Sequence, residues 1–268
     1  GKGGKAAKKD GVITAGISYE LGTNGYDPAS TTAALTIAAN WHTMEGLTEI
    51  HPATRKVYAA LAAEMPKKVD DTTYEVTLRK DAKFSNGSPV TTEDVLYSFQ
   101  RVIDPANKSL YAQFLSFVDK VEAKDASTIT FKLKHAFVLL PERLSVVKIV
   151  PKAVVEADPK NFTYKVVGTG PYKMTDNGAA KQVIVFERND HYNGPYPALV
   201  KTMKWNIMPD DTTRTNAMTS GTVQAIDAVP AANLPTFTEP VKVSALQGFG
   251  LLFAMFNTST FSDVKARQ

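Results

Sequence analysis

The sequence has 268 residues, of which 43% are hydrophobic, so the chain can bury a sizeable core in one large or two modest domains. Its formal charge is +4, but Lys2, Lys5, Lys8 and Lys9 precede the first acidic residue, Asp10, and the other 27 basic residues equal the 27 acidic ones. This neutral body argues against nucleic-acid binding, the lack of an apolar run of about 18 residues argues against a membrane span, and the absence of cysteine excludes disulfides and thiolate chemistry.

The first part of the chain predicts a tether, a strand and a loop. Residues 1–9, GKGGKAAKK, are typical of a flexible solvated tether or of a spacer from a membrane anchor. Residues 12–18 form a short apolar run that predicts a buried strand, and Gly, Asn, Asp and Pro residues between 22 and 28 predict a loop. Open α/β sheets hold ligands at the carboxyl ends of their strands. The segment that follows the strand is therefore a candidate ligand contact, formed by Tyr19, Glu20, Leu21 and Gly22.

A helix is predicted next. Ser30 or Thr31 would cap it, because short polar side chains satisfy the free N–H groups of a first turn. Its predicted apolar face is wide and consists of Leu35, Ile37, Ala38, Trp41, His42 and Met44. Trp41 is either a packing residue or a candidate ligand contact, since a large ring with one polar atom suits both positions. The order of strand, loop and helix indicates an α/β fold.

Residues 50–135 have the pattern of a small α+β unit. Apolar and polar residues alternate over 73–79 and again in TITFKLK, which predicts two half-buried strands. Thr91, followed three residues later by Asp94, predicts a helix start, and the helix would end before the Asp-Pro pair at 104–105. The predicted apolar face of this helix consists of Val95, Leu96, Phe99, Val102 and Ile103.

The pattern changes after Pro141, where a short helix is predicted. The segment GTGPYKM (168–174) is interpreted as a turn that enters a strand. Asp210 or Asp211 would cap a later helix whose end is marked by Gly221. Further strands are predicted at residues 183–186, 224–229 and 249–256.

Motifs for catalysis and phosphate binding are missing. GTGPY lacks the Lys-Ser/Thr of a phosphate-binding loop and the third glycine of a dinucleotide fingerprint. The cluster in HTMEGLTEIH (42–51) resembles a metal site, but Gly46 and Pro52 break the geometry that shared ligands need. The pairs Asp70–Asp71 and Asp210–Asp211 are interpreted as turn and cap residues, because adjacent side chains point apart. The sequence therefore predicts no catalytic residue, no metal ligand and no cofactor.

Five segments, in order along the chain, resemble one family. DAKFSNGSPVTTEDVLYSFQR (81–101) closely resembles the signature of the family 5 extracellular solute-binding proteins, the peptide and nickel receptors of ABC importers. The other four segments are YDP to MEGL (26–47), GTGPYKM (168–174), NDHYNG (189–194) and SGTVQAID (220–227). The closing FNTSTFSDVKARQ is similar to the family segment that leads from the first lobe into the second.

The resemblance implies an α/β fold. The chain would form the first lobe of a periplasmic-binding-protein-like type II structure, with an inserted α+β subdomain, and the second lobe would be absent. The expected parts are a tether (1–9), a first segment of lobe I (10–48), the inserted subdomain (49–160), a second segment of lobe I (161–256) and the start of the crossover (257–268). Ser262 and Asp263 predict a helix start close to Gln268, and family members are roughly twice this length, so we expect a fragment.

The resemblance also implies a function. The chain would be the N-terminal half of a substrate-binding protein of an ABC importer, which captures oligopeptides or dipeptides by closing two lobes over them. Tyr111 would form a hydrogen bond with the ligand backbone, and Gly248 and Phe249 would line the cleft beside the Tyr19 to Gly22 loop. A single lobe would bind weakly and self-associate through exposed apolar surface.

The implied partners are a peptide or another small solute, the permease subunits of the ABC transporter and the missing second lobe. No nucleic acid is expected, and the membrane would be reached only through a lipid anchor. The implied location is extracytoplasmic, as a periplasmic or cell-surface lipoprotein, and the implied protein is not an enzyme.

Three alternatives stay open. A nickel or metal-chelate receptor of the same family would use His42 or His51 and would lose stability with a chelator. An enzyme would need a cleft carboxylate with a strongly raised pKa. A one-lobe interaction module would need an exposed groove without lobe closure.

Overall fold

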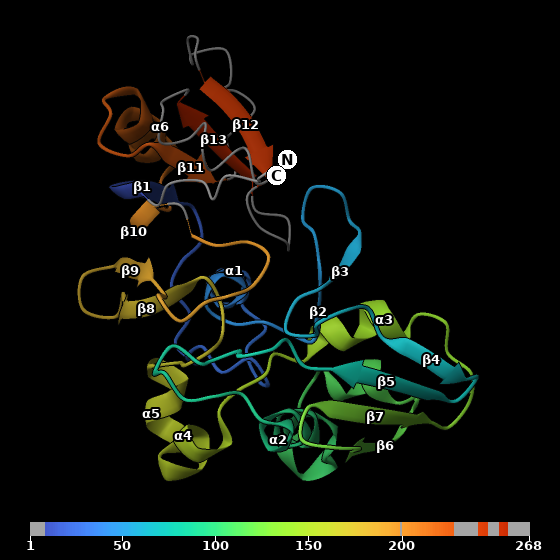
Figure 1. Cartoon of the computed structure of the whole chain (residues 1–268). Helices are drawn as coiled ribbons and strands as arrows, with labels where there is room; N and C mark the ends of the chain where they lie inside the picture. Colours follow the sequence, from blue (N-terminus) through green and yellow to red (C-terminus); the bar gives the residue numbers. More distant parts are fainter. Residues whose placement is uncertain (1–8, 199, 228–240, 246–251, 257–268) are drawn as a thin grey trace.

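A seven-stranded mixed sheet and a four-stranded antiparallel sheet organise the structure (Figure 1). The computed structural model describes residues 9–198, 200–227, 241–245 and 252–256. The helices in these described ranges are all too short or too polar to cross a membrane.

The seven-stranded sheet has the strand order β12-β13-β11-β1-β10-β9-β8. The first strand, β1 (Lys9–Ile17), is central and runs parallel to both of its neighbours, β10 (Val200–Ile207) and β11 (Ala225–Asp227). All other pairs of adjacent strands in this sheet are antiparallel. The outer strands are β8 (Tyr172–Asn177), β9 (Val183–Arg188), β12 (Val241–Ala245) and β13 (Leu252–Phe256).

Helix α1 (Ala34–Thr43) lies beside this sheet and shares its core. The core contains alternate residues of β1, because successive side chains of a strand point to opposite faces. It also includes residues of α4 (Lys152–Ala157) and α5 (Pro159–Tyr164), whereas α6 (Asp211–Thr219) contacts β1 and β11. Large members of this first core are Ile17, Leu35, Phe162, Phe186 and Trp205.

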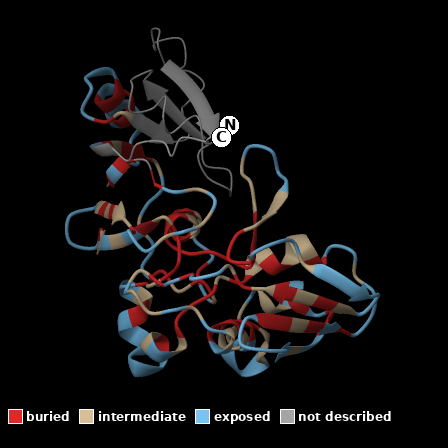
Figure 2. Ribbon diagram, in the orientation of Figure 1, coloured by how far each residue is buried: buried red, intermediate tan, exposed pale blue. Residues whose placement is uncertain are grey.

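The second core lies under the four-stranded sheet, whose order is β4-β5-β7-β6 (Figure 2). Its strands are β4 (Lys67–Asp70), β5 (Thr73–Thr77), β6 (Val118–Ala123) and β7 (Thr128–Leu133). Helix α2 (Thr92–Ile103) packs on β6 and β7. The Phe99 ring of this helix meets the Phe131 ring of β7 edge-on at 5.0 Å, so apolar spacing in the sequence becomes direct packing.

Short elements connect the two cores. Strands β2 (Thr48–Ile50) and β3 (Val57–Ala59) form a hairpin, and α3 (Leu140–Arg143) follows the second sheet. Three 3₁₀ turns complete the described elements, at Pro105–Asn107, Ala112–Leu115 and Leu144–Val146.

Most predicted elements are confirmed. The strands at β1, β5, β7 and β9 form where alternation or apolar runs predict them, and the α2 face is buried as expected at its centre. Thr91 and Asp94 form the predicted capping box, and Asp210 caps α6 through Thr213 N–H at 2.6 Å. The predicted strands at 224–229 and 249–256 extend in part outside the described residues. The division into tether, lobe segments and inserted subdomain stays a prediction.

The predicted cap of α1 is wrong. The helix begins at Ala34, and no side chain caps it. The Thr31 hydroxyl is hydrogen-bonded to the Thr36 hydroxyl instead, while Ser30 N–H and Thr31 N–H both donate to Asp27 O in a preceding turn. Met44, expected on the helix face, lies just after the helix in an extended conformation, although its side chain is buried.

Candidate ligand-binding site

A pocket of about 250 Å³ lies where α1, the β2–β3 hairpin and the Leu144–Val146 turn meet. Two of the predicted ligand contacts, Trp41 and Tyr111, line it. Its apolar walls include Ile37, Ile50 and Val146. The pocket therefore combines residues that are distant in the sequence, because it forms between elements of the two cores.

Trp41 reaches the pocket from the last turn of α1. Ile37 lies four residues earlier and lines the same pocket, as expected for two positions on one helix face. The Trp41 ring is half-buried and meets the His42 ring edge-on at 5.5 Å. Trp41 is thus held by packing on one side while it forms a wall of the pocket.

Tyr111 is held in place by its own hydroxyl group. This hydroxyl donates a hydrogen bond to Thr31 O at 2.6 Å, and the nearby Ser109 hydroxyl donates to Ala29 O at 2.6 Å. Burial raises the pKa of Tyr111, so the phenol is neutral at physiological pH. Because its proton is already donated to Thr31, the oxygen can meet a ligand N–H as an acceptor. The predicted bond to a ligand backbone stays a prediction.

An ion pair forms a polar part of the wall. Lys148 Nζ lies 2.5 Å from Glu49 Oε1, and the two side chains are only 10% and 7% exposed. Glu49 Oε1 also accepts a hydrogen bond from Gly46 N–H at 2.7 Å. Lys148 is not among the residues that the sequence predicts for the site, because 99 residues of the chain separate it from Glu49.

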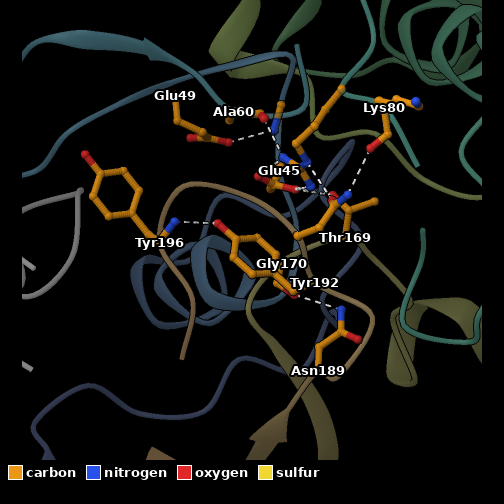
Figure 3. A network of polar contacts seen from close by, with 12 residues as sticks. Glu45, Glu49, Ala60, Lys80, Thr169, Gly170, Asn189, Tyr192 and Tyr196 are labelled. Carbon is orange, nitrogen blue, oxygen red and sulfur yellow. Dashed lines mark hydrogen bonds and ion pairs between the residues drawn. The ribbon is translucent and has the colours of Figure 1, made fainter. Parts of the chain in front are cut away.

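Glu45 and Arg79, which do not line the pocket, form a second buried ion pair. Figure 3 shows Glu45 in a network of polar contacts with Thr169. Arg79 Nη2 and Nη1 donate to the two carboxylate oxygens of Glu45 at 2.9 and 3.1 Å, in a two-pronged geometry that suits a guanidinium. The Thr169 hydroxyl donates to Glu45 at 2.9 Å, and Arg79 Nε donates to Asn193 Oδ1 at 2.8 Å. Burial raises the pKa of Glu45, although Arg79 and Thr169 act in the opposite direction.

This network brings together three of the five segments whose sequences resemble the family. Glu45 belongs to MEGL, Thr169 lies in GTGPY and Asn193 in NDHYNG, while Arg79 lies two residues before the start of the Asp81 to Arg101 signature. In the same region, Asn189 Nδ2 donates to Gly170 O at 2.9 Å (Figure 3). These three motifs and Arg79 thus meet in space as a polar junction between the two cores.

The other predicted contacts do not line the pocket. Tyr19, Glu20 and Gly22 are exposed in the loop after β1, and Leu21 packs against the first core. Gly248 and Phe249 lie outside the described residues. The ligand-binding role of all these residues stays a prediction.

The four candidate metal ligands in HTMEGLTEIH, which are His42, Glu45, Glu49 and His51, do not converge. The His42 ring packs among the rings of Tyr172, Phe186 and Trp205, and the His51 ring lies 5.8 Å from that of Tyr196. Glu45 and Glu49 face Arg79 and Lys148. Across the part of the chain that the structure describes, no group of three or more His, Cys, Asp or Glu side chains could hold a metal ion.

The fold is similar to that of solved binding proteins, and a family model matches most of the chain. The solved structure of the binding protein AgaA from A. tumefaciens R10, in complex with agropinic acid, is similar with a TM-score of 0.79 and 26% identity, over 87% of this chain and 47% of AgaA. Residues 56–268 match the family described as bacterial extracellular solute-binding proteins, family 5 Middle. The chain belongs to this family.

Two curated relatives are similar to this chain over more than half of its length. Protein XP55 of Streptomyces lividans is 36% identical over an alignment of 166 residues that covers 60% of this chain and 30% of XP55. The dipeptide-binding protein DppE of Bacillus subtilis (strain 168) is 28% identical over an alignment of 240 residues that covers 81% of this chain and 43% of DppE. The chain thus spans well under two thirds of the length of these relatives.

Proposed function

We propose that the chain is the first-lobe part of a two-lobe receptor that captures peptides for an ABC importer. The observation that carries this proposal is the similarity to the dipeptide-binding protein DppE over 81% of the chain. The inserted α+β subdomain would be the four-stranded sheet with α2, and the pocket would be one part of the ligand cleft. A second lobe would supply the facing wall.

The proposed binding mode relies on backbone hydrogen bonds and adaptable walls. Peptide-binding proteins often hold the main chain of a peptide and let pockets accept varied side chains. Here Tyr111 would accept a hydrogen bond from a peptide N–H, and Trp41 would cover an apolar side chain. The loop from Tyr19 to Gly22, together with Gly248 and Phe249, would contact the ligand farther along the cleft. No catalytic step is required.

The proposed setting is extracytoplasmic. The Gly/Lys-rich residues 1–9 would act as a tether to a lipid anchor, and the permease subunits of the importer would receive the loaded receptor. Nickel binding is not favoured by any cluster of ligands in the described residues. A peptide is therefore the ligand that we propose.

A calorimetric titration with di-, tri- and pentapeptides tests the proposal. We expect saturable binding with a Kd between about 1 µM and 1 mM, because half of the cleft supplies part of the recognition energy. The variant Tyr111→Phe should weaken binding about fivefold, since it removes one hydrogen-bonding oxygen. Tyr97→Phe is the matched control, because Tyr97 is a half-buried tyrosine on α2 that does not line the pocket.

Two results would contradict the proposal. One is the absence of any heat or thermal stabilisation with peptides at millimolar concentration. The other is an equal loss of affinity in the Tyr111 and Tyr97 variants, which would mean that the pocket is not the place of binding.

A further inference from the structure

The pocket has an excess of positive charge. Its lining includes two cationic side chains, Arg55 and Lys148, and one acidic side chain, Glu49. Lys148 neutralises Glu49 by direct contact at 2.5 Å, and Gly46 N–H occupies the same carboxylate oxygen. One positive charge, that of Arg55, is therefore left over.

Arg55 is well placed to bind a ligand group. It lies in the connection between β2 and β3, where its backbone adopts a left-handed conformation with φ of 60° and its N–H donates to His51 O at 2.8 Å. Its side chain is exposed, and no acidic partner holds its guanidinium within the described ranges of the chain. A guanidinium presents paired N–H groups whose geometry matches a carboxylate.

The rest of the lining is largely apolar and the pocket is small. Pro28, Ile37, Trp41, Ile50 and Pro52 provide carbon surface. A volume of about 250 Å³ is below the range of roughly 300–1,000 Å³ in which pockets hold a whole small ligand. The pocket is thus suited to one apolar group of a larger ligand.

We propose that this pocket binds an apolar group that ends in a carboxylate, with Arg55 pairing with the carboxylate and the apolar wall covering the alkyl part. For a peptide, which is the ligand under the proposed function, this group is a C-terminal residue with an aliphatic side chain. Lys148 assists, because its ammonium has three N–H donors and the contact with Glu49 uses one of them. A neutral amide of the same shape lacks the charge that Arg55 recognises.

A matched pair of small probes tests the inference without a peptide. The ¹⁵N-labelled chain is titrated with 4-methylpentanoate and with 4-methylpentanamide, which share one alkyl group. We expect both probes to shift the Trp41 indole N–H signal. We also expect the carboxylate to bind about fivefold more tightly than the amide, because this gain lies between the contribution of an exposed ion pair and that of a buried charge-assisted hydrogen bond.

Variants of the hairpin separate a local contact from a general charge effect. Arg55→Gln should bind both probes equally, since it keeps an exposed polar side chain but loses the charge. Lys56→Gln removes the same charge from the next position, which is exposed and does not line the pocket. It should keep the fivefold preference.

Equal binding of the two probes by the unaltered chain, or no shift of the Trp41 signal with either probe, would overturn the inference. A loss of preference in Lys56→Gln as large as in Arg55→Gln would also overturn it. If the carboxylate probe binds as expected while peptides do not, the proposed function fails and the pocket inference stands. If peptides bind but amidation of their C-terminus has no effect and the probes bind equally, only the pocket inference fails.

Discussion

Replacement of Arg79 by alanine tests the importance of the polar junction between the two cores. The Glu45 and Arg79 side chains are 6% and 13% exposed, and two hydrogen bonds of 2.9 and 3.1 Å join them. Without Arg79, the Glu45 carboxylate would keep the Thr169 hydroxyl but would lose its cationic partner. Removal of one member of a buried ion pair costs about 3–5 kcal/mol. We expect a loss of this size in the free energy of unfolding.

Urea denaturation followed by circular dichroism measures this loss, and thermal unfolding provides a second reading. For a domain of about 150–250 residues, 1 kcal/mol shifts Tm by roughly 2–4 °C, so the expected decrease in Tm is about 6–20 °C. Lys124→Ala is the control, because the Lys124 side chain, paired with Glu75, is 53% exposed. Little change is expected there, since exposed ion pairs contribute little to stability.

The pH dependence of the stability loss in Arg79→Ala tests whether the unpaired Glu45 carboxylate causes that loss. Burial raises the pKa of Glu45, so the folded protein binds the proton of this carboxyl group more tightly than the unfolded chain does. The contribution of Glu45 to stability is therefore most favourable at low pH and is lost as the pH rises through the folded pKa. In Arg79→Ala the pKa should rise further, so the stability deficit should shrink as the pH is lowered.

The double variant Glu45→Gln with Arg79→Met removes both charges and should recover much of the stability that Arg79→Ala loses. The reasoning would be refuted by an Arg79→Ala loss below about 1 kcal/mol, or by a double variant as unstable as the single one. Either result would mean that the junction does not depend on charge pairing.

Three further predictions concern local structure. Thr91→Ala should lose about 1 kcal/mol in urea denaturation because it removes the α2 cap, whereas Thr91→Ser should be nearly neutral. Gly170→Ala should strongly lower Tm, since its Cβ would lie 2.5 Å from backbone atoms, while Gly11→Ala meets nothing within 4 Å and should not. The hydrogen bond from the backbone N–H of Thr213 lowers the pKa of Asp210 in the folded chain. The Asp210 cap therefore stabilises α6 above the unfolded pKa of this carboxyl group, and the stabilisation is lost as the pH falls through the folded pKa. Hydrogen exchange in α6 should show this acid dependence in the unaltered chain and not in Asp210→Asn.

Local sequence patterns predict the individual elements well. The alternation in β5 and β7, the Thr91–Asp94 capping box and the Asp210 cap depend on neighbours in the sequence, and the structure confirms them. The α1 cap was mispredicted because the competing partner of Thr31, the Thr36 hydroxyl, sits inside the first turn of the helix itself. A polar residue before a helix caps it only if its hydroxyl is not bonded elsewhere.

The candidate site was predictable only in part. Trp41 and Tyr111 stood out as large rings at the right positions of a resembling family, and the structure brings both to one pocket. Lys148 and Arg55 gave no such signal, since neither lies in a segment that resembles the family. Their place in the pocket wall depends on how the hairpin and the Leu144–Val146 turn pack against α1.

Periodicity and capping residues in the sequence predict the α/β class and most helices and strands, and the resemblance of the ordered motifs indicates the family. The pairing of Glu45 with Arg79 and of Glu49 with Lys148, over separations of 34 and 99 residues, is visible only in the folded chain. Local patterns contain no information on which buried charges meet, since that choice is made by the packing of the two cores. Burial makes each of these charges require a partner, and the fold supplies it.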